Sequence, residues 1–424
     1  MKIALISFHS FYQPGGVKRH VFGLHKEFQK RGIYSKIIAP RRKRQEYYGK
    51  DVILLGTSFP LPFSGSQSDF CINFNPLAIE RVLKKEKFDV LHFHNFGFPS
   101  VWQILERSDT LNILTFHANI EGSEFLKNFP FVLYLLNKMV QWKIDGVIGV
   151  APLNLEVFKG FKGPKAVIPN GIDLSEFNPK VPKIKKYLDG KINILFVGRI
   201  EERKGLIYLL KAYKILEKKL GSNWVASNLR LIIVGKGPLK RDLGKWAKIN
   251  KLRNVIFEGE IKEEKAPFYY STCDIFCSPA IFGESFGLVL VEAMACGKPV
   301  VAFANEGYQQ VLKGLQPTHR PPAEGGPLGA KFLAKPKDYK TLAEKLEILI
   351  KNQKLRKEMG EWGIKEAQKY SWPKIADRIL DFYELCRKNK QKKKSRKKIL
   401  SIDKILKKMY NKDILNWLKK LKIV

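Results

Sequence analysis

Two glutamates eight positions apart are the residues best placed to do chemistry in this chain. Glu284 and Glu292 lie in the stretch FGESFGLVLVEAMACGKP, residues 282–299. A helix that starts beside Ser285 and Gly287 would leave backbone N–H groups unpaired in its first turn, and its dipole would favour an anion there. A glutamate next to the first turn of the helix could accept hydrogen bonds from the hydroxyl groups of a sugar beside the anion. Eight helical residues rise about 12 Å, so the segment could hold both ends of a nucleotide sugar.

A buried helix with two incidental glutamates is the alternative interpretation of this segment. Glutamate is rarely buried without a partner. The run Gly297-Lys298-Pro299 would end the helix and lead into the apolar residues 300–302. The pattern therefore favours a binding element over a plain core helix.

Two cations follow a strand-like run in the second half of the chain. Arg199 and Lys204 come after the apolar residues 193–197, and Gly205 follows them. Arginine offers a fork for two phosphate oxygens and lysine a point charge, so the pair could neutralise a leaving diphosphate. In so basic a chain, a solvated loop is the alternative.

A Gly-Gly turn follows the first strand-like run. Gly15 and Gly16 come shortly after residues 2–8 and open a helical stretch. Glycine permits a tight turn and lets backbone N–H groups approach a diphosphate closely. A plain strand-to-helix turn could contain the same dipeptide, so the position after the first strand is what favours phosphate binding.

The glutamate segment resembles the Glu-x7-Glu motif of retaining glycosyltransferases of family four, which have the GT-B fold. The resemblance covers the chain from Met1 to about Cys386, and its nearest likeness within the family is to phosphatidylinositol mannosyltransferases. Six further stretches carry it in order: GGVKRH at 15–20, DVLHFH at 89–94, TFHA at 115–118, IPNGID at 168–173, FVGRIEERKG at 196–205 and VGKGP at 234–238.

The resemblance implies a role for each matching residue. Glu284 would orient sugar hydroxyls, Glu292 would bind the ribose, and His117 would contact the donor sugar near the acceptor side. Arg199 and Lys204 would stabilise the leaving diphosphate. The acceptor would attack from the leaving-group face and so retain the anomeric configuration. The remaining donor-binding positions would be Gly15, Gly16, Ser285, Phe286 and Gly287.

Metal ligands are not evident in the sequence. No Asp-x-Asp pair is present, and cations with helix amides could supply the charge stabilisation that a metal gives elsewhere. His92 and His94 alternate on a strand and would share one face. Without a nearby cysteine or carboxylate they favour packing or an acceptor-side role over a metal site. We therefore expect no essential metal and no cofactor.

One segment departs from the nearest likeness. In phosphatidylinositol mannosyltransferases the loop that matches residues 60–70 carries arginines that help to bind the acceptor's phosphate. This chain has Gln67, Ser68 and Asp69 there. An aspartate would repel a phosphate, so the segment argues against an inositol-phosphate acceptor.

Short apolar runs alternate with helical stretches, which is the pattern of parallel α/β sheets. Ligands of such sheets bind outside the carboxyl ends of the strands.

We predict an α/β protein of two doubly wound domains facing a cleft. Residues 1–170 form the acceptor-side domain and 171–371 the domain for the nucleotide sugar, and a crossover helix near 372–386 returns to the first domain. The expected strands are 2–8, 35–39, 52–55, 90–93, 112–115 and 146–150, then 193–197, 229–234, 255–258, 275–278 and 299–303; the expected helices are 20–31, 76–87, 126–142, 205–220 and 240–248.

The charge balance points to an anionic partner. The 424 residues carry 77 lysines and arginines against 40 acidic residues, a net charge of +37, while five cysteines show no zinc or disulfide spacing. Residues 387–424 hold 16 basic and 2 acidic residues. Their first part is predicted to be disordered, and from residue 399 apolar residues recur at helical spacing, typical of an amphipathic helix on a membrane surface. Packing on the protein's own surface is the alternative.

The leading hypothesis is an enzyme that moves mannose or another hexose from a nucleoside diphosphate sugar to a lipid or lipid-linked acceptor. It would be cytoplasmic and bound through 387–424 to the anionic inner face of the cell membrane, since no run reaches the roughly 18–20 apolar residues of a bilayer span. A soluble transferase that builds an acidic polysaccharide is a second hypothesis. A non-catalytic nucleic-acid-binding protein is a third, but no recognition motif for specific nucleic acid supports it.

Overall fold

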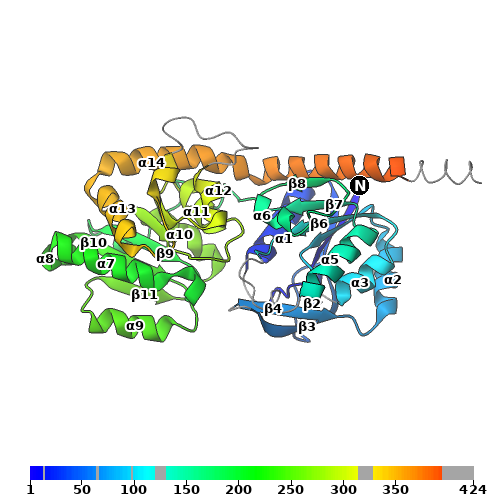
Figure 1. The fold of residues 1–424 in the computed structure, drawn as a ribbon, viewed down its shortest axis with the longest axis horizontal. Helices are drawn as coiled ribbons and strands as arrows, with labels where there is room; N and C mark the ends of the chain where they lie inside the picture. The colour runs from blue at the N-terminus through cyan, green and yellow to red at the C-terminus, as the bar shows by residue number, and fades with distance from the viewer. Residues whose placement is uncertain (13–14, 64–65, 97–98, 120–129, 314–327, 394–424) are drawn as a thin grey trace, which may run out of the picture.

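The computed structural model describes residues 1–12, 15–63, 66–96, 99–119, 130–313 and 328–393. Two α/β domains lie side by side, and two helices, Gln353–Ala367 and 372–393, follow one another along one edge of the pair (Figure 1). The Pro/Gly-rich segment 316–327 and most of the basic tail, 394–424, lie outside the described residues. Among those described, none of the helices combines the length and the apolar composition that a bilayer span requires.

The first domain is built on an eight-stranded sheet in the order β4-β3-β2-β1-β5-β6-β7-β8. Every neighbouring pair is parallel except β3 and β4. The strands are β1 (Lys2–Ser7), β2 (Tyr34–Arg41), β3 (Val52–Phe63), β4 (Ser66–Ile72), β5 (Val90–His94), β6 (Leu111–Phe116), β7 (Gly146–Gly149) and β8 (Lys165–Val167). The helices are α1 (Gly16–Lys30), α2 (Pro76–Glu86), α3 (Ser100–Glu106), α5 (Pro130–Lys143) and α6 (Pro152–Glu156).

The second domain has a six-stranded parallel sheet in the order β11-β10-β9-β12-β13-β14. The strands are β9 (Ile192–Val197), β10 (Leu229–Val234), β11 (Val255–Gly259), β12 (Ile275–Ser278), β13 (Val300–Phe303) and β14 (Leu333–Ala334). The helices are α7 (Leu206–Leu220), α8 (Ser222–Asn228), α9 (Lys240–Ile249), α10 (Ala266–Thr272), α11 (Leu288–Ala295), α12 (Glu306–Leu312), α13 (Tyr339–Lys351) and α14 (Gln353–Ala367). Strands such as β10 are buried along their whole length, as expected for a parallel sheet covered on both faces. The predicted architecture of two parallel-sheet domains is confirmed.

The crossover helix is longer than the sequence suggested. It spans residues 372–393, whereas 387 onward was predicted to be disordered; that prediction is wrong for 387–393. Its apolar face packs into the core of the first domain. Lys390 adds an ion pair with Asp145, at 2.7 Å between Nζ and Oδ2. Packing and this ion pair extend the helix into the lysine-rich run.

The strand expected at 52–55 is longer in the structure and belongs to a hairpin. β3 and β4 form an antiparallel pair, with Thr57 opposite Ile72 and Phe63 opposite Ser66. The sequence analysis did not predict the extension of β3 to residue 63 or the strand β4. Prolines at 60 and 62 reduce strand propensity, but pairing between neighbouring strands outweighs it here. The hairpin places 67–69 on the outermost strand of the sheet.

Candidate active site

The two domains meet where the amino-terminal ends of α1 and α11 approach each other. A methyl group on Gly16 would lie 3.9 Å from Cδ1 of Leu288, the first residue of α11. Ser285 donates a hydrogen bond from Oγ to the carbonyl oxygen of His117 at 2.6 Å. The fold therefore brings the Gly-Gly turn, the glutamate segment and His117 together, although they are far apart in sequence.

Glu284 lies before the helix and not within it. α11 begins at Leu288, and Gly287 precedes it with φ +100°. A side chain on Gly287 would collide with the buried ring of Tyr308, 2.6 Å away. Both constraints require glycine at this position. Because residues 284–287 are not helical, the 12 Å estimate from eight helical residues does not hold.

The Glu284 carboxylate is held by two cations. Its Oε1 lies 2.5 Å from Nζ of Lys204 and 2.8 Å from Nη1 of Arg203. Burial opposes ionisation, but the charges of Lys204 and then Arg203 outweigh it and lower the pKa of Glu284. Glu284 is therefore an ionised carboxylate beside the domain junction, with 11% of its side chain exposed. The sequence analysis missed Arg203, although it stands in the same basic run as Lys204.

Arg199 has a different environment from Lys204. Its side chain is half exposed, and Nε lies 3.3 Å from Oε2 of Glu201. It lines a cavity of about 480 Å³ beside Gly198, Gly235 and Gly237, at the carboxyl ends of β9 and β10. Ligands of parallel sheets bind at such strand ends, so this cavity is the candidate nucleotide site. Lys204 does not line this cavity, but its side-chain stem lies next to Gly198, so Arg199 and Lys204 occupy adjoining positions.

Glu292 is buried and has two partners. Tyr270 donates a hydrogen bond from its hydroxyl to Oε2 at 2.7 Å, and Arg19 of α1 forms an ion pair with Oε1. Glu292 is the largest influence on the guanidinium of Arg19 and raises its pKa. This ion pair crosses the domain junction. The sequence analysis did not identify Arg19, because no local pattern relates residue 19 to residue 292.

Arg19 stands between two cavities. It lines the 480 Å³ cavity and also a larger one of about 700 Å³ on the side of α1, where Phe22, Asp173 and Trp372 contribute. The larger cavity is lined by Glu292 but contains neither Arg199 nor the glycines at the strand ends. The smaller one therefore suits a diphosphate better.

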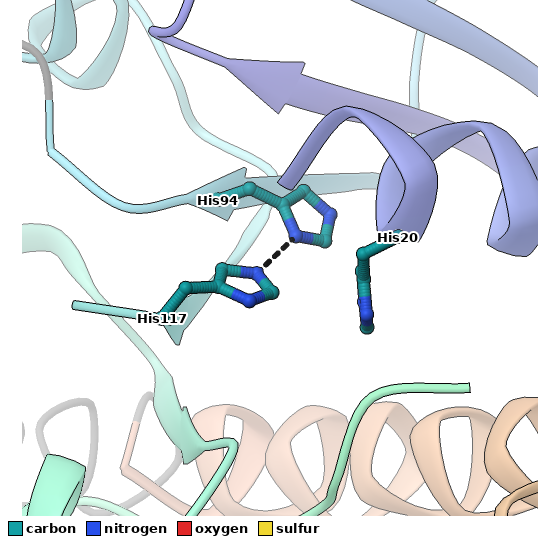
Figure 2. Close-up of side chains that lie close together, drawn as sticks. All are labelled: His20, His94 and His117. Carbon is teal, nitrogen blue, oxygen red and sulfur yellow. Dashed lines mark hydrogen bonds between the residues drawn. The ribbon is translucent and has the colours of Figure 1, made fainter. Parts of the chain in front are cut away.

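His117 is partly buried and lies against two buried histidines, His20 and His94. Its Nε2 lies 3.1 Å from Nδ1 of His94, and the ring of His20 faces both (Figure 2). Burial lowers the pKa of His117 well below its usual value, and His20 adds to that effect. His92 bonds Thr115 and Tyr383 with its two ring nitrogens, at 2.6 and 2.7 Å, so it serves packing.

The sequence of the chain matches two known family models. The model described as "Glycosyltransferase Family 4" matches residues 14–176, and that described as "Glycosyl transferases group 1" matches residues 178–366. The phosphatidyl-myo-inositol mannosyltransferase of Mycobacterium leprae is 31% identical over 397 residues, which cover 91% of this chain and 96% of that protein. The chain belongs to glycosyltransferase family 4. The α-monoglucosyldiacylglycerol synthase of Streptococcus pneumoniae is also similar to this glycosyltransferase, with 27% identity over 72% of the chain and 71% of that enzyme.

Solved structures agree on the fold of this glycosyltransferase. A sucrose-phosphate synthase from Thermosynechococcus elongatus superposes with a TM-score of 0.70 and 22% identity, covering 90% of this chain and 98% of that one. Anabaena HepE in complex with UDP-glucose gives a TM-score of 0.65 at 16% identity, covering 91% and 99%. At such identities the likeness concerns the fold, and it confirms the GT-B architecture.

Proposed function

We propose that this glycosyltransferase moves a hexose from a nucleoside diphosphate sugar to a lipid or lipid-linked acceptor at a membrane surface, with retention of the anomeric configuration. The observation that carries the proposal is the Glu284 carboxylate, fixed by Lys204 and Arg203. The side-chain stem of Lys204 lies next to Gly198, which lines the cavity at the strand ends. An ionised carboxylate accepts strong hydrogen bonds from sugar hydroxyls. Its position one side chain away from that cavity fits a donor whose sugar and phosphates must be held together.

The leaving diphosphate is the group on which negative charge develops. In our proposal, Arg199 at the rim of the cavity and Lys204 beside Glu284 stabilise it, together with backbone N–H groups near Gly16. Cations and dipoles that are already in position act in this way without a metal, so the reaction needs none. The sugar–phosphate bond breaks, the acceptor oxygen bonds to the anomeric carbon on the same face, and the leaving phosphate takes the acceptor's proton.

Glu292 is assigned to the ribose. In this structure Arg19 and Tyr270 occupy both of its oxygens. A ribose hydroxyl that bonds Glu292 must therefore share the carboxylate with Arg19. This places Arg19 within reach of the donor and makes it part of the proposed donor site.

An exposed aromatic surface on the first domain supports a membrane-bound acceptor. The rings of Trp102 on α3 and Trp142 on α5 stack at 5.0 Å, and about half of each residue is exposed. Tyr134 and Leu135 on α5 are exposed as well. Tryptophan and tyrosine favour the interface between water and lipid, and lysines such as Lys143 beside Trp142 add attraction to anionic headgroups. The names of the mannosyltransferase and of the glucosyldiacylglycerol synthase also indicate lipid acceptors.

Donor screening and transfer assays test the proposal. Nucleoside diphosphates and their hexose conjugates are first compared by the rise in melting temperature of the full chain. The best donor, with a radiolabelled sugar, is then offered to lipid vesicles and to soluble oligosaccharides. We expect label in the lipid fraction. Label in the soluble polymer alone would favour the polysaccharide hypothesis, and no stabilisation by any donor would refute the proposal.

The membrane surface needs its own test. Replacement of both Trp102 and Trp142 by alanine should lower co-sedimentation with anionic vesicles and leave donor binding unchanged. Trp224→Ala is the matched control, because this exposed tryptophan belongs to α8 of the second domain. Equal loss in the control, or no loss in the double variant, would remove this support.

A further inference from the structure

Three histidines from three separate elements converge beside the proposed donor site. His20 comes from α1, His94 from the end of β5, and His117 from the residue after β6. One ring nitrogen from each lies within 4.8 Å of the other two. Figure 2 shows the three rings around a common space. They meet because β1, which leads into α1, is the neighbour of β5, and β5 of β6.

The cluster holds polar atoms that the protein leaves unpaired. His20 is 2% exposed, and neither of its ring nitrogens has a hydrogen-bond partner. Nε2 of His94, which is fully buried, has none either, nor has Oδ1 of Asn170. Buried polar side chains nearly always find partners. A neutral imidazole carries one N–H and one lone pair, and none of the described residues uses the lone pair of His20.

The side chain of Asn170 lies beside the rings of His20 and His117. Its oxygen is placed to accept a hydrogen bond from the N–H of a ring whose other nitrogen binds an ion. Such outer contacts orient histidine ligands.

The spacing of the nitrogens suits a small ion. Bonds of about 2.0–2.1 Å from zinc to imidazole nitrogen in a tetrahedron put two ligand nitrogens about 3.3 Å apart. His94 Nδ1 and His117 Nε2 are already 3.1 Å apart. Small ring rotations would therefore bring His20 into the same coordination sphere. His117 is only partly buried, so the fourth position would face the cleft.

We propose that His20, His94 and His117 form a binding site for one divalent transition ion of the zinc class. A site with three histidines and an open fourth position takes zinc readily. An ion bound at this site would fix the ring of His117. The backbone carbonyl of His117 accepts the hydrogen bond from Ser285, which is next to Glu284. The ion would thus compete with the donor sugar and inhibit transfer; this second part rests on the proposed function.

Binding is tested first, on the full chain freed of metal. Calorimetry with Zn²⁺ should give one tight site per chain, and Co²⁺ should give the visible absorption of a four-coordinate ion. His20→Gln and His117→Gln should each weaken binding at least 100-fold, because loss even of an outer contact costs 10–100-fold. His25→Gln is the matched control: it is a buried histidine of the same helix, bonded to Ser35 through Nδ1 at 2.8 Å. It should bind as the wild type does.

X-ray absorption of the zinc-loaded wild type keeps the proposal testable if a variant does not fold. Three imidazole ligands are expected, and fewer than two would overturn it. Binding that stays within threefold of wild type in His20→Gln would overturn it as well. Inhibition is a separate readout: Zn²⁺ should inhibit transfer by the wild type, and His20→Gln should need at least tenfold more. Tight binding without inhibition would retain the site and reject only the link to the donor.

Discussion

Replacing Glu284 by glutamine removes one charge at almost constant shape. The carboxylate accepts bonds from Lys204 and Arg203 at 2.5 and 2.8 Å, and in our proposal it also accepts bonds from two sugar hydroxyls. A hydrogen bond to a charged group contributes roughly 1.5–3 kcal/mol, against about 0.5–1.5 for a neutral one. Two bonds therefore lose about 2–3 kcal/mol in the transition state. That loss corresponds to a decrease of kcat/KM of roughly 30–150-fold.

Binding of the nucleoside diphosphate without its sugar should not weaken in this variant. Lys204 and Arg203 lose a counter-charge when Glu284 becomes neutral, so their attraction for phosphate is kept or increased. Glu292→Gln is the matched comparison, because it removes the carboxylate assigned to the ribose. It should weaken binding of both the diphosphate and the complete donor.

Steady-state transfer rates and calorimetry with the diphosphate measure the two effects, and melting temperatures show whether each variant is folded. The reasoning is refuted if Glu284→Gln keeps kcat/KM within threefold of wild type. It is refuted equally if diphosphate affinity falls in step with kcat/KM, since Glu284 would then contact the nucleotide and not the sugar.

Four further predictions concern metal, backbone, pH and the tail. Transfer should survive EDTA; complete loss that Mn²⁺ restores would contradict the metal-free proposal. Gly205→Ala should destabilise the fold by more than about 1 kcal/mol, because φ is +67° and a Cβ would lie 2.0 Å from the carbonyl oxygen of Pro279. Gly190→Ala is the control: φ is +84°, but a Cβ there would meet open space, so a denaturation titration should show a smaller loss of stability. His20 has a pKa of about 4 when folded and about 6.5 when unfolded, so acidification from pH 7 to 5 should remove about 2 kcal/mol of stability through His20 alone. His20→Gln should reduce the pH dependence in chemical denaturation by that amount, while His92, His94 and His117 keep the rest. Deletion of 394–424 should release the protein from anionic vesicles but leave nucleotide binding intact; unchanged co-sedimentation would refute the tail as an anchor.

The sequence was informative where function depends on local pattern. Alternating strands and helices predicted the two sheets, since a βαβ unit is encoded by periodicity and turns within a few tens of residues. Lys204 could be selected because it follows a strand at the edge where parallel sheets bind ligands. Glu284 could be selected because it stands at a predicted helix start and in the Glu-x7-Glu motif. The strongly basic character of residues 387–424 was equally evident from their composition.

Local pattern failed at the hairpin and at the end of the crossover helix. The hairpin depends on pairing between β3 and β4 that overrides the low strand propensity of the prolines at 60 and 62. Helix 372–393 continues through a lysine-rich run because its inner face is buried against the first sheet and Lys390 meets Asp145. In both cases tertiary contacts outweigh intrinsic preference.

Only the tertiary structure decided which residues share the site. Arg19 reaches Glu292 across 273 positions, and His20 joins His94 and His117 because the sheet order places β1 beside β5 and β5 beside β6. The sequence determined the kinds of groups that could bind a nucleotide sugar. Which of these groups contact one another depends on how the elements and the two domains pack. Such contacts join residues that are far apart in sequence, so no periodic pattern along the chain predicts them.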